Sequence, residues 1–171
     1  MKKFKLAVQA ATLVSILALA SLAASAQVKH TLKGTYINTC APAGCPLVSM
    51  PATGSWQSIG SPTEINCPTP VGQTCTVVAD QFLQVGNSTD GGGAVELCPV
   101  LDEVGGQCFG DNGRVPGDGS FDAMFVSLPL FDWSSGTWTI SPGNHSVQEM
   151  VFTTVPAAYL SYTFTYNVYV P

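Results

Sequence analysis

Acidic residues with the chemistry of cation ligands are concentrated between positions 102 and 122. The four aspartates of this segment, which also contains several glycines, are Asp102, Asp111, Asp118 and Asp122. Calcium binds six to eight oxygens, and loops of Asp, Asn and Gly supply carboxylate and carbonyl oxygens together. The spacing lacks the alternating ligands and closing Glu of a helix-loop-helix calcium loop, so a site here would be irregular. Turns favour the same residue types, and that alternative stays open.

Carboxyl groups also serve glycoside hydrolysis, which needs an acid and a base roughly 5–10 Å apart across one cleft. Among the glutamates, Glu96 and Glu149 fall inside expected strands, and acids on strands more often face solvent. The sequence has no Gly-x-Ser-x-Gly or His-Glu-x-x-His motif and no glycine-rich phosphate loop. His145, the one well-placed imidazole, fits a structural hydrogen-bonding role at a turn. We therefore expect a non-enzymatic protein and rank glycoside hydrolase third among the hypotheses.

Aromatic residues beside acids provide a second lead. Trp133 follows Asp132 in an expected loop, and Asp90 lies in another loop rich in Asn, Asp and Gly. Sugars stack their apolar faces on aromatic rings, while carboxylates and amides bind the hydroxyls. Trp133, Asp132 and Asp90 are thus the candidate ligand-binding residues. The alternative for the tryptophan is packing in a core.

Six cysteines form three couples that are close in sequence. They are Cys40 with Cys45, Cys67 with Cys75, and Cys98 with Cys108. An even number of cysteines in an exported chain indicates disulfides, and we expect sequential pairing around Pro- and Gly-containing loops. Each bridge would contribute roughly 2–3 kcal/mol through chain entropy. The spacings do not suit a four-ligand zinc site.

We expect the chain to fold into strands, because 17 Gly and 12 Pro leave few windows long enough for a helix. Residues 160–170 alternate apolar and polar side chains with a period of two, which predicts a strand with one buried face. Further strands are expected at 29–40, 55–59, 76–85, 94–100, 121–128, 136–140 and 147–155. A turn at 141–144 is expected to join the segments 136–140 and 147–155 as a hairpin.

Eight short strands predict an all-β fold. The expected architecture is a single antiparallel β-sandwich of jelly-roll or Greek-key type, stapled by disulfides. The domain is expected to comprise residues 27–171, without an internal repeat.

Residues 1–26 have the layout of a secretory signal peptide. A basic start is followed by an apolar run and then by Ala-Ser-Ala, the small-x-small pattern that precedes cleavage. No second apolar run after residue 27 is long enough to span a membrane. We expect a secreted, periplasmic or cell-surface protein.

The charge balance excludes one class of partner. The 171 residues carry a formal charge of −5, and residues 27–171 hold three basic side chains against 11 acidic ones, a charge of −8. Such a surface repels phosphate backbones, so nucleic-acid binding is not expected.

Residues 141–148 read Ser-Pro-Gly-Asn-His-Ser-Val-Gln and precede an apolar strand, a break, and a Tyr-rich strand ending in Val-Tyr-Val-Pro. This stretch resembles the close of a loose group of exported bacterial β-sandwich proteins, in which a Pro-Gly-x-His-Thr-Val-Gln turn opens the penultimate strand. The Gly-Asp-Gly-Ser-Phe sequence at 117–121 is more faintly similar. The resemblance implies export and a sandwich with the strand order of the tumour-necrosis-factor type, and it assigns no activity.

Two hypotheses of different class follow. The first is a non-enzymatic exported binding or structural domain whose loops contact a glycan or another extracellular macromolecule, with calcium as the one cofactor considered. The alternative is a self-assembling surface subunit, in which residues 28–36 add a strand to the sheet edge of a neighbouring copy. The ordinary interpretation of that segment is a first strand within its own sheet.

Overall fold

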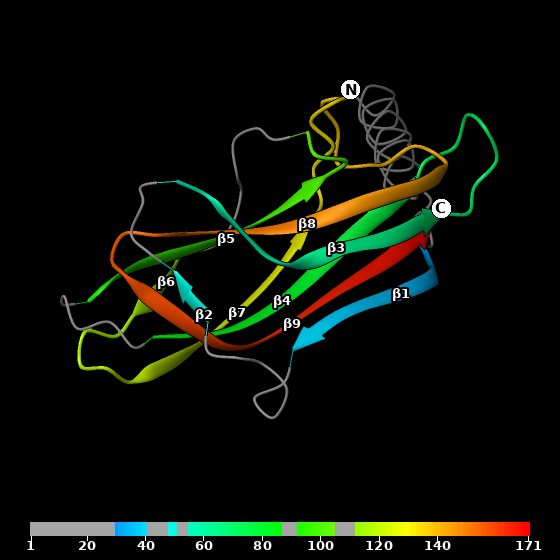
Figure 1. Cartoon of the computed structure of the whole chain (residues 1–171). Helices are drawn as coiled ribbons and strands as arrows, with labels where there is room; N and C mark the ends of the chain where they lie inside the picture. Colours follow the sequence, from blue (N-terminus) through cyan, green and yellow to red (C-terminus); the bar gives the residue numbers. More distant parts are fainter. Residues whose placement is uncertain (1–29, 41–47, 51–54, 87–91, 105–111) are drawn as a thin grey trace, which may run out of the picture.

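The computed structural model describes residues 30–40, 48–50, 55–86, 92–104 and 112–171. Within these ranges the chain forms nine strands and no helix. Figure 1 labels each of these strands. The strands are β1 (Thr31–Cys40), β2 (Val48–Met50), β3 (Gln57–Cys67), β4 (Thr76–Gly86), β5 (Gly93–Leu101), β6 (Asn112–Val115), β7 (Phe121–Pro129), β8 (Gly143–Thr153) and β9 (Ala157–Val170).

The strands form two antiparallel sheets packed face to face. One has the order β1-β9-β4-β7, with the short β2 also paired to β9, and the other has the order β3-β8-β5-β6. Apart from β2, the chain crosses between the sheets at every connection except β5 to β6. These orders are those of a jelly roll, so the predicted fold class is confirmed.

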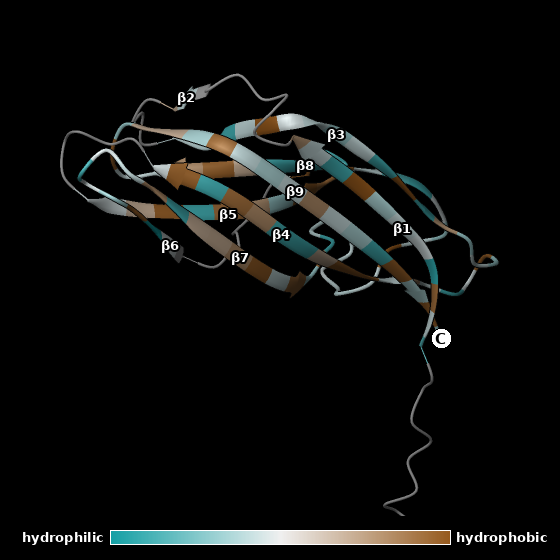
Figure 2. Cartoon of the chain, turned by 90° about the horizontal axis from the view of Figure 1, so that it is seen from below, coloured by the Kyte–Doolittle hydropathy of each residue, from teal (hydrophilic) through white to brown (hydrophobic). Residues whose placement is uncertain are grey.

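The core lies between the sheets and follows the alternation expected for residues 160–170. Tyr162, Phe164, Tyr166 and Val168 point inward and are at most 8% exposed. The residues between them belong to the outer face of the β1-β9-β4-β7 sheet, which Figure 2 shows with its strands side by side. Period-two hydrophobicity therefore decided the faces of residues 162–168, as it does in strands generally. The expectation was wrong at the start of the segment, where Leu160 is only half-buried and Ser161 is buried, because the β4–β9 register shifts there.

Strand β3 is longer than expected because a bulge carries it past a turn-like sequence. The prediction ended this strand at Ile59, before Gly60, Ser61 and Pro62. The structure shifts the β3–β8 register between Ile59 and Thr63 and then continues the pairing to Cys67. Gly60 has φ +65°, and a Cβ there would lie 2.5 Å from the Tyr162 hydroxyl oxygen. A glycine is thus required at the bulge.

The hairpin predicted between residues 136–140 and 147–155 is wrong. Thr137 and Ile140 each form an isolated bridge, to Asp132 and Cys75 respectively, and the intervening residues are turns and bends. One bridge at Thr137 and one at Ile140, with bends between them, do not make a continuous ladder of paired residues. The short strands β2 and β6 were not predicted.

Strand β1 lies at the edge of its own sheet. Its residues pair with β9 from Thr31 to Cys40, with an irregularity between Leu32 and Gly34. The described part of the proposed donor segment is therefore already paired within the chain, which agrees with its ordinary interpretation.

One predicted disulfide is present in the described residues and joins Cys67 at the end of β3 to Cys75, which immediately precedes β4. Cys40 and Cys98 are also disulfide-bonded. Cys45 and Cys108 lie outside the described residues, so the pairs that include them stay predictions. Across the described ranges, no helix has the length and apolarity to cross a membrane.

Candidate functional site

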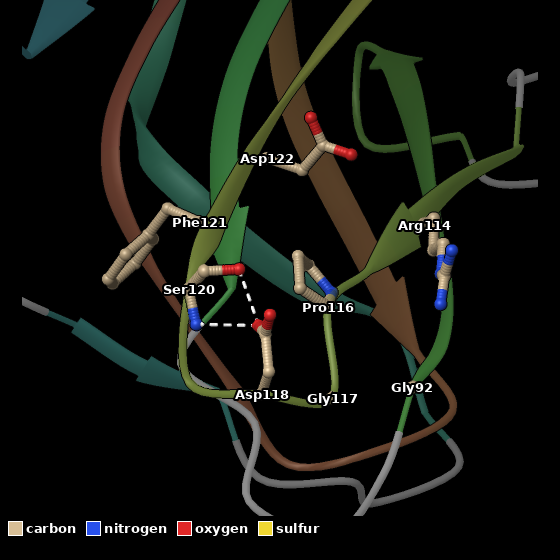
Figure 3. Close-up of a pocket in the computed structure, with 8 residues that line it drawn as sticks. All are labelled: Gly92, Arg114, Pro116, Gly117, Asp118, Ser120, Phe121 and Asp122. Carbon is tan, nitrogen blue, oxygen red and sulfur yellow. Dashed lines mark hydrogen bonds between the residues drawn. The ribbon is translucent and has the colours of Figure 1, made fainter.

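A recess that we call the loop-end pocket lies where β5, β6 and β7 meet. It measures about 430 Å³ and is lined by Gly92, Arg114, Pro116, Gly117, Asp118, Ser120, Phe121 and Asp122. In Figure 3, Arg114 lies across the pocket from Asp118, while the ring of Phe121 points away to the other side. Two of the four predicted calcium ligands, Asp118 and Asp122, therefore border one pocket together with a guanidinium group.

The carboxylate of Asp118 is organised by its own turn. Its Oδ1 accepts hydrogen bonds from the hydroxyl and the backbone N–H of Ser120. These bonds, followed by a smaller attraction from Arg114, hold the pKa of Asp118 below its usual value. An acid with a lowered pKa stays ionised at neutral pH, so Asp118 can bind a cation or accept hydrogen bonds. It is a poor proton donor for glycoside hydrolysis.

Asp102 lies far from this pocket. It follows the end of the nine-residue strand β5, whose first residue Gly93 pairs with Val115 beside the pocket. Such a strand is about 27 Å long. Asp102 therefore does not share a site with Asp118 and Asp122. Asp111 lies outside the described residues, and no cluster of three or more His, Cys, Asp or Glu side chains suited to a metal occurs in the described ranges. Calcium binding by the remaining aspartates stays a prediction.

Asp102 instead fixes His145 at the start of β8. Its Oδ2 lies 2.7 Å from Nδ1 of His145, and its Oδ1 accepts a bond from the backbone N–H of Ser146. Nε2 of His145 lies 2.9 Å from the carbonyl oxygen of Ser141. Burial opposes protonation of the imidazole, but Asp102 and the Ser141 carbonyl outweigh it and raise the pKa of His145. Two acceptors, one at each ring nitrogen, favour the doubly protonated ring and a structural role.

Asp132, a predicted ligand-binding residue, caps a turn. Both of its carboxylate oxygens accept hydrogen bonds from Ser134 or Ser135, and the side chain is only 7% exposed. Burial would raise the pKa of Asp132, but the bonds from the two serines lower it overall. Its neighbour Trp133 packs edge-on against Phe131 at 4.6 Å between ring centroids. Asp90, the third predicted ligand-binding residue, lies outside the described residues.

A second recess, which we call the sheet-face groove, crosses the outer face of the β1-β9-β4-β7 sheet. It measures about 390 Å³. The outward-facing side chains that line it are Asp80, Phe82, Phe125, Ser127, Thr163 and Thr165. Phe125 is 74% exposed and lies 4.8 Å from Phe82 between ring centroids. The volume of the groove falls within the range of small-molecule binding sites.

Asp80 is pre-oriented beside these rings. One carboxylate oxygen accepts a hydrogen bond from the Ser127 hydroxyl, and the other accepts one from Nδ2 of Asn167 at 2.8 Å. A carboxylate has about four lone-pair sites, so two remain for a ligand. Asp80 forms no ion pair with any described residue. The groove thus combines an exposed aromatic surface with a fixed carboxylate and several hydroxyls.

Sequence reasoning missed the groove because its residues come from three strands that are distant in the chain. A signal was present, since Asp80 and Phe82 on one strand and Phe125 and Ser127 on another occupy outward positions. Large aromatic side chains on the solvent-exposed face of a sheet indicate a candidate binding surface. Only the pairing of Phe82 with Phe125 and of Asp80 with Ser127 shows that the two sets lie together.

Glu149 is the described carboxyl group with a raised pKa, and it lies in neither recess. It is 1% exposed and accepts hydrogen bonds from Gln81 Nε2 and from the Tyr166 hydroxyl at 2.7 Å. Burial raises the pKa of Glu149 to about 7, although both hydrogen bonds act in the opposite direction. Glu149 therefore ties β4 and β9 to β8 through its two hydrogen bonds inside the core.

No family model and no curated protein matches this sequence. Among solved structures, the chain is similar to a GH26-CBM35 β-(1,4)-mannanase from Podospora anserina, with a TM-score of 0.33 and 12% identity over 75% of this chain and 27% of that one. The chain thus spans about a quarter of the mannanase's length. A likeness at this level supports no conclusion about family or function.

Proposed function

We propose that the protein is a non-enzymatic, exported binding domain that recognises a glycan at the sheet-face groove. The observation that carries the proposal is the exposed ring of Phe125, which lies beside Phe82 in a groove that is also lined by Asp80 and by three hydroxyl side chains. A pyranose can stack its apolar face on such a ring while its hydroxyls bond to the carboxylate and the hydroxyl side chains.

The chemistry of the acids supports a non-enzymatic role. The glycosidase alternative needs an acid with a raised pKa in a cleft. Asp118 borders a pocket, but its pKa is lowered, and Glu149 has a raised pKa but is buried in the core. Neither Asp118 nor Glu149 combines a raised pKa with a position in a cleft, so neither suits proton transfer to a bound sugar.

The Cys67–Cys75 bridge supports export, because disulfides persist in oxidising compartments. Together with the expected signal peptide, it favours a role outside the cytoplasm. The self-assembly hypothesis is less favoured, since β1 already pairs with β9.

Affinity electrophoresis tests the proposal. The oxidised protein is run on native gels that contain soluble neutral or acidic polysaccharides. We expect retardation by at least one of them, lost in Phe125→Ala and kept in Val71→Ala, a matched control at a site that is 98% exposed and outside the groove. Normal mobility on every polysaccharide, or equal retardation of Phe125→Ala, would contradict the proposal.

A further inference from the structure

The groove is the centre of a longer arrangement on the sheet. Strand register places one row of outward side chains across all four strands, in the order Phe125, Phe82, Thr163, Thr39. A second row runs beside it in the order Ser127, Asp80, Thr165, Ile37. Both rows therefore continue from the groove onto the edge strand β1.

The two rows form a strip that is longer across the strands than along them. Four strands at the usual spacing span about 14 Å, whereas two rows are separated by about 7 Å along each strand. The extension is exposed, since Ile37 is 62% exposed and Thr39 is also exposed. A single sugar ring would leave the β1 end of this strip uncovered.

The side chains of the strip are held in place by one another. The hydroxyls of Thr39 and Thr163 lie 2.9 Å apart, and Ser127 donates to Asp80. Such ordering before binding reduces the conformational entropy that a ligand must overcome. A ligand that follows the rows would meet rings at the β7 end and hydroxyls at the β1 end.

The charge of the strip constrains the ligand. Asp80 is the one charged side chain in the two rows, and residues 27–171 carry a formal charge of −8. An anionic chain would be repelled. A neutral chain with a flat, extended shape fits the two rows.

From these observations we infer that the strip binds a linear, neutral oligosaccharide lying across the strands, with its anchored end on Phe125 and its distal end on Ile37 and Thr39. This inference rests on the proposed function and adds the class and orientation of the ligand.

Calorimetric titration with β-1,4-linked gluco-, manno- and xylo-oligosaccharides of two to six units tests the inference. We expect at least one series in which the six-unit chain binds about tenfold more tightly than the two-unit chain, because only the longer ligand reaches β1. Ile37→Thr should weaken binding of the six-unit chain several-fold and leave the two-unit chain unchanged. Leu32→Thr is the matched control, an equivalent change at a 49% exposed position of β1 outside the rows.

Equal affinity for short and long chains, or equal effects of Ile37→Thr and Leu32→Thr, would overturn the inference. So would polysaccharide retardation that depends on Phe125 but is accompanied by no binding of any neutral oligosaccharide. That last result would leave the proposed function intact, whereas retardation that is insensitive to Phe125→Ala would remove the function itself.

Discussion

Gln81 on β4 donates a hydrogen bond from its Nε2 to Oε2 of Glu149 on β8, so a carboxyl group in the middle of the core joins the two sheets. Tyr166 on β9 donates to the other oxygen of the same carboxyl group. Gln81 lies between Asp80 and Phe82 in sequence, with its side chain on the opposite face of the sheet. The strand that supplies two groove residues is therefore anchored directly beneath them.

The buried Glu149 predicts that the protein loses stability as the pH rises. Its pKa is raised from 4.5 to about 7 in the folded state, so between these values the unfolded chain is ionised while the folded chain keeps its proton. Unfolding then releases a proton, and the free energy of unfolding falls with rising pH by on the order of 3 kcal/mol. Urea unfolding between pH 4 and 8 measures this slope.

The Glu149→Gln variant should lose most of that slope, because it has no proton to release. Glu96→Gln, which removes a carboxyl group from a half-buried position on β5, is the matched control and should keep it. A slope that persists in Glu149→Gln would show that other groups produce it.

His145 should titrate above the ordinary histidine value of about 6.5. Its raised pKa in the folded state means that the stability from its contact with Asp102 is complete below the unfolded pKa and is lost as the pH rises through the folded pKa. An NMR titration of the ring protons measures the midpoint directly. Asp102→Asn should lower it, and a wild-type midpoint at or below 6.5 would mean that burial outweighs Asp102 and the Ser141 carbonyl.

The Cys67–Cys75 bridge joins two residues at a sequence separation of 8 and closes the connection between β3 and β4. Chain entropy predicts that Cys67→Ala combined with Cys75→Ala lowers the free energy of unfolding by about 2–3 kcal/mol. Denaturant unfolding of the double variant under oxidising conditions gives the value. A loss below about 1 kcal/mol would indicate that the bridge constrains the unfolded chain little.

The fold could be predicted because alternation along single strands determines which face is buried. Residues 162–168 show this, since the inward positions deduced there from hydrophobicity are those that fill the core. The same logic failed at Gly60, Ser61 and Pro62, where a bulge absorbs residues that usually end a strand. The prediction of a strand at 136–140 was also wrong. These residues have a β-like composition, but they form only isolated bridges and no continuous ladder with a neighbouring strand.

The site was harder to predict because it depends on which strands are neighbours. Nearness in sequence grouped Asp102 with Asp118 and Asp122, but the length of β5 places Asp102 at the other end of the strand. Conversely, Asp80 and Ser127 are far apart in sequence and adjacent in the sheet. The alternation of apolar and polar residues along one strand shows which face is buried, but it does not show which distant strand will be its neighbour in the sheet.

The position of the bound glycan can be located by mapping amide chemical shifts during titration with a fragment of a polysaccharide that retards the protein. We predict that the largest shifts lie on β4, β7 and β9 around Asp80, Phe125 and Thr165. They should be absent in Phe125→Ala and present in Val71→Ala. Shifts confined to the loop-end pocket around Arg114 and Asp118 would show that the glycan does not bind at the sheet-face groove.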